Sequence, residues 1–513
     1  MTVEEKMLSA GSGALFLTAL GAVSQLLGFC YRVALSRMAG AEVMGLYQLI
    51  MPVYSVLLSL TAVGMTAAVS NLTPQYLALG NRKGAHETLC TCLKGFFLLL
   101  LPVGVLVILG SDAISVYLLG DARTQLGLML LVPCAALTGV ENCHKHFFYG
   151  AGLVQPPAVV ELLEQFVRTL AVLGLLWMFL PQYPERVVGL IVLGMVICEI
   201  FSSVTLVTLY RRRLNRLGLT GQGERGKIRR RRVLSIGLPV ALNALLGNLL
   251  GAANATLIPQ KLVEGGVERS EAISQFGVVC GMTMPMLSLP IVFLGALNLV
   301  LVPRLARACA LNRRDEVRRL VGQAISAVAV LTLPAMSLMA VVGPDLGRAM
   351  FHQERVGEHL IPLAVTMAMS CFASVLASTL NGVGSQRAVA VISLVGGGVQ
   401  LLFTLALVPL PGVGMKGYVA GAVVSTGLEL ILLLHWTVRR TGLRISLFRW
   451  LTAPGLASLL SALTGNLLFR VLKSSGLSPV SSGLATLAFS LVLYLAALQA
   501  QGVSLRETLR LNW

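Results

Sequence analysis

The sequence predicts an all-α polytopic membrane protein of about fourteen transmembrane helices, because apolar runs of membrane-spanning length recur along the whole chain. Of the 513 residues, 56% are hydrophobic and 12% are charged, and the mean hydropathy is +0.81. An ordinary soluble domain has about 25% charged residues. Each apolar run should form a helix, because the bilayer core offers the backbone no water for hydrogen bonding.

The runs fall into two sets of six and a final pair. We expect no cleaved signal before the first run, because Met1–Leu8 is polar. The first set of predicted spans is Ser12–Tyr31, Met44–Val69, Gly95–Tyr117, Leu126–Cys143, Val159–Leu180 and Val187–Tyr210. The second set is Val233–Ile258, Phe276–Val302, Val321–Val342, His359–Leu380, Ala388–Leu410 and Gly417–Val438. The final pair is Trp450–Phe469 and Ser482–Gln499.

The distribution of positive charge predicts the orientation. With the N-terminus in the cytoplasm, the cytoplasmic segments hold 28 of the 40 Lys and Arg residues and the external segments hold 11. Lys and Arg in short loops are retained on the cytoplasmic side. We therefore expect both termini in the cytoplasm of a bacterial inner membrane, with an even number of spans.

The loop Arg211–Arg232 holds ten of those basic residues and separates spans six and seven. The formal net charge of +18 could suggest a nucleic-acid partner, but the loop lacks interleaved aromatic residues. We expect no nucleic acid and infer that the loop faces anionic lipid head groups instead.

An internal repeat of about 230 residues supports a division at this loop. Pro74, Pro102 and the Gly150–Gly152 turn have counterparts in the same order at Pro303, Pro334 and Gly382–Gly384. The predicted divisions are a bundle at 1–210, a linker at 211–232, a bundle at 233–438 and two extra helices with a tail at 439–513. Because each repeat has an even number of spans, the two six-helix bundles should be related by a pseudo-twofold axis along the membrane normal.

Charged residues inside spans are costly and are functional candidates by default. Span five carries Glu161, Glu164 and Arg168 on one stripe, and Glu164 and Arg168 are spaced to pair across one helical turn. Two interpretations stay open: a charged cavity that binds substrate, or an ion pair that only joins helices. Glu199 and Glu429 lie in corresponding spans, six and twelve; either could carry a proton, and neither has an obvious partner.

Gln25 and Arg32 lie two helical turns apart on one face of span one. The guanidinium of Arg32 could bind a diphosphate, although an ordinary interfacial arginine is the alternative, as it is for Arg37. Asn243 in span seven and Asn298 in span eight are further candidates, or they hydrogen-bond neighbouring helices.

Enzyme signatures are absent, and we expect no enzyme activity and no cofactor. Gly412–Gly417 fits G-x-G-x-x-G, but no strand precedes it, so we expect a tight turn. Cys143, His144 and His146 could suggest a metal site, but a metal usually requires more converging ligands, and we expect none.

Two motifs resemble the stage V sporulation protein B family, which belongs to the multidrug/oligosaccharidyl-lipid/polysaccharide flippase superfamily. The first motif comprises Val23–Arg32, Gly45–Gln48 and Pro52–Tyr54. The second comprises Tyr149–Gly152, Pro157–Ala158 and Glu164–Arg168. Related lipid II flippases carry Arg where this chain has Gln25, and their second Arg is displaced by one residue, to Arg32.

The resemblance implies two six-helix bundles that alternate between inward and outward openings. It also implies an undecaprenyl-diphosphate-linked sugar or a peptidoglycan precursor as cargo. Two other functions remain open. One is a cation-coupled multidrug exporter of the same superfamily, although span seven lacks the carboxylate that such exporters tend to need. The other is a non-transporting scaffold for envelope assembly.

Overall fold

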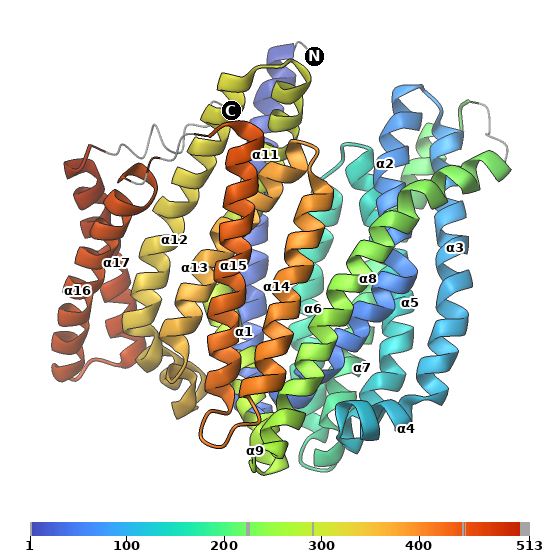
Figure 1. The fold of residues 1–513 in the computed structure, drawn as a ribbon. Coiled ribbons are helices and arrows are strands. Elements are labelled where there is room, and N and C mark those ends of the chain that lie inside the picture. Colours follow the sequence, from blue (N-terminus) through green and yellow to red (C-terminus); the bar gives the residue numbers. More distant parts are fainter. Residues whose placement is uncertain (1–2, 222–225, 290–291, 444–445, 447, 503–513) are drawn as a thin grey trace. The chain divides into compact units, whose positions relative to one another are not determined.

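The computed structural model describes residues 3–221, 226–289, 292–443, 446 and 448–502, and these residues form helices joined by short turns (Figure 1). The first helices are α1 (Val3–Leu58), η1 (Ser59–Val63), α2 (Gly64–Ala78), α3 (Arg82–Leu109), α4 (Ser111–Ala113), η2 (Ile114–Leu119), η3 (Ala122–Thr124), α5 (Gln125–Gly150), α6 (Gln155–Phe179), η4 (Pro184–Arg186), α7 (Val187–Leu217) and α8 (Gly226–Glu264). The later helices are α9 (Arg269–Phe276), η5 (Gly277–Thr283), α10 (Met284–Ser288), α11 (Val292–Ala310), α12 (Arg314–Phe351), η7 (Glu354–Gly357), α13 (Leu360–Gly382), α14 (Gln386–Leu407), α15 (Met415–Thr441), η8 (Phe448–Thr452), α16 (Ala453–Ser474) and α17 (Pro479–Ala500).

All fourteen predicted spans fall on helical segments, which confirms the all-α membrane fold. By length and composition, eleven helical stretches among the described residues could cross a membrane. One of these, Leu20–Ala78, is 59 residues long and contains the first two predicted spans. Outside the eleven, the fifth predicted span coincides with α6, and the eighth is distributed over η5, α10 and α11.

The predicted spans one and two belong to two helices that meet at a kink, and the kink lies at Gly40, between Ser12–Tyr31 and Met44–Val69. Helix α1 runs to Leu58, and its backbone leaves helical geometry only at Gly40, with φ 81° and ψ 174°. Glycine tolerates this positive φ because it has no Cβ. Gly45 and Pro52 follow within the same element and keep helical geometry, so the chain bends at Gly40 without opening into a loop.

The contacts divide the chain into a first unit, Met1–Gln260, and a second unit, Lys261–Trp513. This division falls one helix later than the linker at residues 211–232, because α8 packs against α2 and α3. A Cβ on Gly64 of α2 would lie 2.7 Å from the Gly237 carbonyl oxygen of α8. Asn248 of α8 also donates a 2.5 Å hydrogen bond to the Ser59 hydroxyl.

In the first unit, α7 packs closely against both α5 and α6, and α6 packs on α1. Helices in membranes approach one another through small residues. A Cβ on Gly194 of α7 would come within 2.5 Å of the Val172 side chain of α6, so the α6–α7 contact requires glycine. This close approach lies one helical turn from the charged residues of both helices.

The second unit surrounds α12. Helices α11, α13 and α15 bury a common apolar core against it, and α16 and α17 pack along its other side. The Tyr494 hydroxyl of α17 donates a 2.9 Å hydrogen bond to the Val330 carbonyl of α12. Lys473 of α16 forms a 2.9 Å ion pair with Asp345.

Turn geometry repeats between the two units at a constant spacing. Three residue pairs with left-handed backbone, each 232 residues apart, are Gly80 and Asn312, Gly120 and His352, and Gly152 and Gly384. Because positive φ is rare outside glycine, coincidence in all three pairs is strong support for the internal repeat. The expected tight turn near Gly412 is also present, since Gly412 and Gly414 have φ of 78° and 47°.

Candidate functional site

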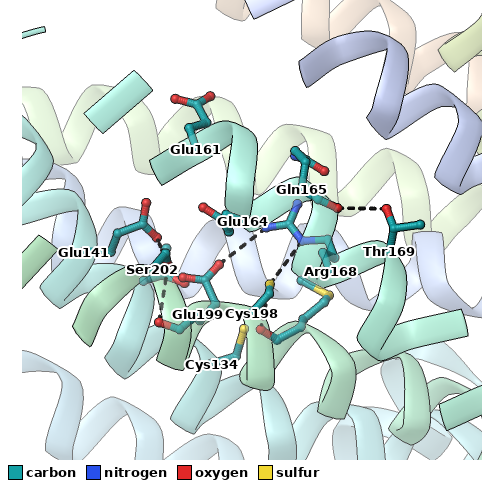
Figure 2. A network of polar contacts seen from close by, with 12 residues as sticks. Cys134, Glu141, Glu161, Glu164, Gln165, Arg168, Thr169, Cys198, Glu199 and Ser202 are labelled. Carbon is teal, nitrogen blue, oxygen red and sulfur yellow. Dashed lines mark hydrogen bonds and ion pairs between the residues drawn. The ribbon is translucent and has the colours of Figure 1, made fainter. Parts of the chain in front are cut away.

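Three glutamates and one arginine meet inside the first unit, where α5, α6 and α7 pack together (Figure 2). Glu141 lies on α5, Glu164 and Arg168 on α6, and Glu199 on α7. The three glutamates are only 4%, 6% and 4% exposed, respectively. We call these four residues the buried charge cluster. Burial of ionised groups is tolerated only where they are paired.

Arg168 is the centre of the cluster. Its Nη2 forms an ion pair and hydrogen bond with Glu164, the pairing that the four-residue spacing predicts. The same Nη2 lies 3.7 Å from Oε1 of Glu199, and Nε donates to the Cys198 sulfur at 3.3 Å. The arginine is therefore held from two helices. Its side chain keeps 21% of its surface exposed.

Glu141 and Glu199 lie on the side of the cluster away from the Arg168 backbone. Ser202, one helical turn after Glu199 on α7, donates a 3.0 Å hydrogen bond to Oε2 of Glu141, so the two glutamates are neighbours in the cluster (Figure 2). Among the described residues, none donates a hydrogen bond of good geometry to the buried Oε2 of Glu199, although the Thr138 hydroxyl is close. The sequence indicated no obvious partner for Glu199, and the structure supplies one, because Arg168 on the neighbouring helix reaches it.

A second ion pair lies toward the helix ends. Nζ of Lys145 on α5 is 2.7 Å from a Glu161 carboxylate oxygen on α6, and the Glu161 side chain is 46% exposed. In the predicted topology these ends face the cytoplasm. Lys145 stands four residues after Glu141, and Glu161 three before Glu164, so charged groups continue from the exposed end of α6 to the buried charge cluster.

Arg32 of α1 lies near the cluster but belongs to a different environment. It is half-buried, and within the described part of the chain no ion pair or hydrogen bond engages its guanidinium. The charges of Arg32 and Arg168 both act on the hydroxyls of Tyr31 and Tyr47. The two arginines therefore share one electrostatic neighbourhood within the first unit.

The other candidates are not brought together with this cluster. Gln25 and Asn243 are exposed on the first unit. Asn298, in the second unit, donates a 3.3 Å hydrogen bond to the Ser374 hydroxyl. Glu429, the counterpart of Glu199 in the repeat, accepts a 2.7 Å hydrogen bond from Ser393.

Sequence reasoning missed Glu141 and Lys145. The signal for Glu141 was present, since it is a charged residue inside the predicted span Leu126–Cys143. Lys145 follows it by one helical turn and lies just beyond that span. Which side chains meet across α5, α6 and α7 depends on how each helix is rotated about its own axis. Hydrophobic periodicity does not reveal that rotation in a span that is apolar on every side.

One group of potential metal ligands occurs among the described residues. Single donor atoms of Glu164, Cys198 and Glu199 lie within 4.8 Å of one another, but the Arg168 guanidinium already contacts all three side chains. A cation there would have to displace the arginine. In the Cys143–His146 segment, Nδ1 of His144 is bonded to the Val140 carbonyl at 2.7 Å.

The fold matches those of two membrane proteins of known structure. A structure of the lipid II flippase MurJ in an inward closed conformation superposes with a TM-score of 0.69 at 11% identity, covering 95% of this chain and 98% of that one. An inward-facing multidrug resistance transporter of the MATE family superposes with a TM-score of 0.65 at 13% identity, covering 84% and 98%.

The sequence profile of a polysaccharide biosynthesis protein family matches residues 10–309, and the chain belongs to that family. It is 25% identical to stage V sporulation protein B of Bacillus subtilis (strain 168) over 82% of each chain. It is 22% identical to the lipid II flippase MurJ of the same organism, covering 81% of this chain and 79% of that one. The resemblance noted in the sequence is confirmed, and these relatives support the expectation that the chain is not an enzyme.

Proposed function

We propose that this chain is a flippase that moves an undecaprenyl-diphosphate-linked sugar or peptidoglycan precursor from the cytoplasmic to the outer leaflet by alternating access. The observation that carries the proposal is Arg168, an arginine inside a membrane span whose side chain is 21% exposed and whose guanidinium is held by carboxylates on α6 and α7. The family membership and the flippase among the relatives support the same assignment.

The chemistry of the cargo explains the arginines. The head group of such a lipid carries a diphosphate, and it must cross the apolar slab while its chains stay in lipid. A guanidinium matches phosphate oxygens with two parallel hydrogen bonds. Arg168, together with Arg32, would bind the diphosphate, while Glu164 orients Arg168 and accepts it again after release. Gln25, Glu161, Asn243 and Asn298 would contact the sugar or line its path.

The membrane placement is part of the proposal. The protein would lie in the bacterial cytoplasmic membrane with both termini inside, so that the linker at residues 211–232 faces anionic lipid. Arg229 of the linker forms an ion pair with Glu87 at 2.5 Å, and Arg232 lies over the Tyr76 ring at 5.2 Å. These contacts anchor the linker to α2 and α3, while Arg211–Arg213 and Arg230–Arg231 stay exposed to the membrane surface.

The test is flipping of a labelled undecaprenyl-diphosphate sugar in liposomes. Arg168→Lys and Arg32→Lys keep the charge and lose the two-pronged hydrogen bonding, so each should slow flipping by about tenfold or more. Arg269→Lys, at an exposed position at the start of α9, is the matched control and should flip at the parental rate. Parental rates in both test variants, at equal expression, would exclude diphosphate recognition by these arginines.

The alternative hypothesis, a cation-coupled multidrug exporter, is compatible with the superposition on a multidrug transporter. Purified protein that exports a cationic dye and flips no lipid-linked sugar would replace our proposal with that reading. Protein that does neither in liposomes, while envelope assembly in cells depends on it, would favour the scaffold.

A further inference from the structure

The buried charge cluster has more negative groups than positive ones. Glu141, Glu164 and Glu199 are all nearly fully buried, and Arg168 is the cation that contacts two of them. Lys145 is engaged by Glu161 at 2.7 Å. With every group ionised, the cluster would hold uncompensated negative charge in an apolar surrounding, which is strongly unfavourable. Three carboxylates and one guanidinium give the cluster a net charge of −2, and a proton on one carboxyl group halves this excess.

Geometry indicates which carboxyl groups carry the proton. Ser202, one helical turn after Glu199 on α7, donates a 3.0 Å hydrogen bond to Oε2 of Glu141, so the two buried glutamates are neighbours, and neighbouring carboxylates repel unless one is protonated. The buried Oε2 of Glu199 lacks a donor of good geometry among the described residues, and a proton shared with Glu141 supplies one. The Arg168–Glu199 distance of 3.7 Å is also long for an ionised pair, whereas Arg168 contacts Glu164 directly.

We propose that Glu141 and Glu199 share one exchangeable proton, and that this proton decides whether Glu199 holds Arg168. When water delivers a proton to Glu199, the new O–H bond neutralises the carboxylate, and Arg168 keeps only Glu164 as an ionic partner. Arg168 is then available to an anionic ligand. When the proton returns to water, ionised Glu199 recaptures the guanidinium. The existence of the shared proton does not depend on the proposed function, whereas its coupling to transport rests on that function.

The groups around Glu199 do not supply an alternative charge balance. The ionisable side chains that act on it from the packed helices are Tyr54 of α1, Cys134 and Glu141 of α5, Glu164 and Arg168 of α6, and Cys198 of α7. Apart from Arg168, none of these is a cation. Lys145 acts on Glu141 and Glu164 from the outer end of α5, where the 46% exposed Glu161 provides a route for protons to water.

The shared proton can be measured without any transport. Purified full-length protein in lipid nanodiscs should show, by infrared spectroscopy at neutral pH, the carbonyl stretch of a protonated carboxyl group. Glu141→Gln should remove that band, because it leaves Glu199 beside Arg168, and Glu199→Gln should shift it, because Glu141 then keeps only its hydrogen bond from Ser202. Glu429→Gln, the repeat counterpart of Glu199, should leave it unchanged. A parent without the band, or a band at the same position in both test variants, overturns the proposal, as does sodium binding that Glu199→Gln abolishes.

Coupling is tested by binding of geranyl diphosphate at several pH values. Parental affinity should rise as pH falls, by up to about tenfold per pH unit for one linked proton. Glu199→Gln mimics the protonated state, so it should bind geranyl diphosphate tightly. Its affinity should depend less on pH than the parental affinity does, once the titration of the ligand's own phosphates, which is the same for both proteins, is subtracted. Equal pH dependence in parent and variant refutes the coupling. If neither binds the diphosphate, the proposed function fails while the infrared measurement still decides the shared proton.

Discussion

Arg168→Ala should be among the most destabilising substitutions in the first unit. The change removes the cation that contacts Glu164 and Glu199, which are 6% and 4% exposed. Stranding a buried charge by removing its partner typically costs about 3–5 kcal/mol. If Glu199 is already neutral through its shared proton, Glu164 carries most of this cost. A second substitution, Glu164→Gln, should therefore recover about 1–3 kcal/mol, and Glu199→Gln should recover less.

The measurement is the free energy of unfolding of purified protein in mixed micelles titrated with a denaturing detergent. Arg32→Ala is the control, because no ion pair or hydrogen bond in the described residues holds Arg32, and it should cost about 0.5 kcal/mol or less. If Arg168→Ala is as stable as Arg32→Ala, the ion pair does not hold the helices. If Glu164→Gln gives no recovery in the double variant, Glu164 is not the stranded charge.

Three further outcomes are expected. Reporter fusions after Arg225 and after Glu268 should report cytoplasm and exterior, and the opposite pattern would reverse the topology. Gly64→Leu should cost about 1–3 kcal/mol of stability, because its Cβ would meet the α8 backbone at 2.7 Å, whereas Gly251→Leu has open space; equal losses would remove the α2–α8 contact as the cause. Burial lowers the pKa of His359 below 6.5, so its stabilisation is present above pH 6.5 and lost as pH falls; His359→Gln should flatten this loss in an acid titration of unfolding.

The exact end of the first helix and the grouping of α8 illustrate what the hydropathy pattern leaves open. Polar residues around Arg32 and Arg37 lower the local hydropathy, but the helix extends through them to Gly40, where it meets the next helix at a kink. The basic linker suggests a boundary before α8. The contacts of Gly64 and Asn248 nevertheless place that helix with the first unit, because close backbone approach depends on small residues facing each other.

The sequence by itself determined the membrane class, the positions of the helices, the internal repeat and the Glu164–Arg168 pair, because these depend on local apolar length and on spacing within one helix. Only the tertiary structure decided that Arg168 also reaches Glu199, that Glu141 joins them, and that Lys145 pairs with Glu161. The physical reason is that lipid-facing and protein-facing surfaces of a membrane helix are both apolar. Periodicity therefore does not reveal the rotation of each helix, and which charged groups meet is settled by packing.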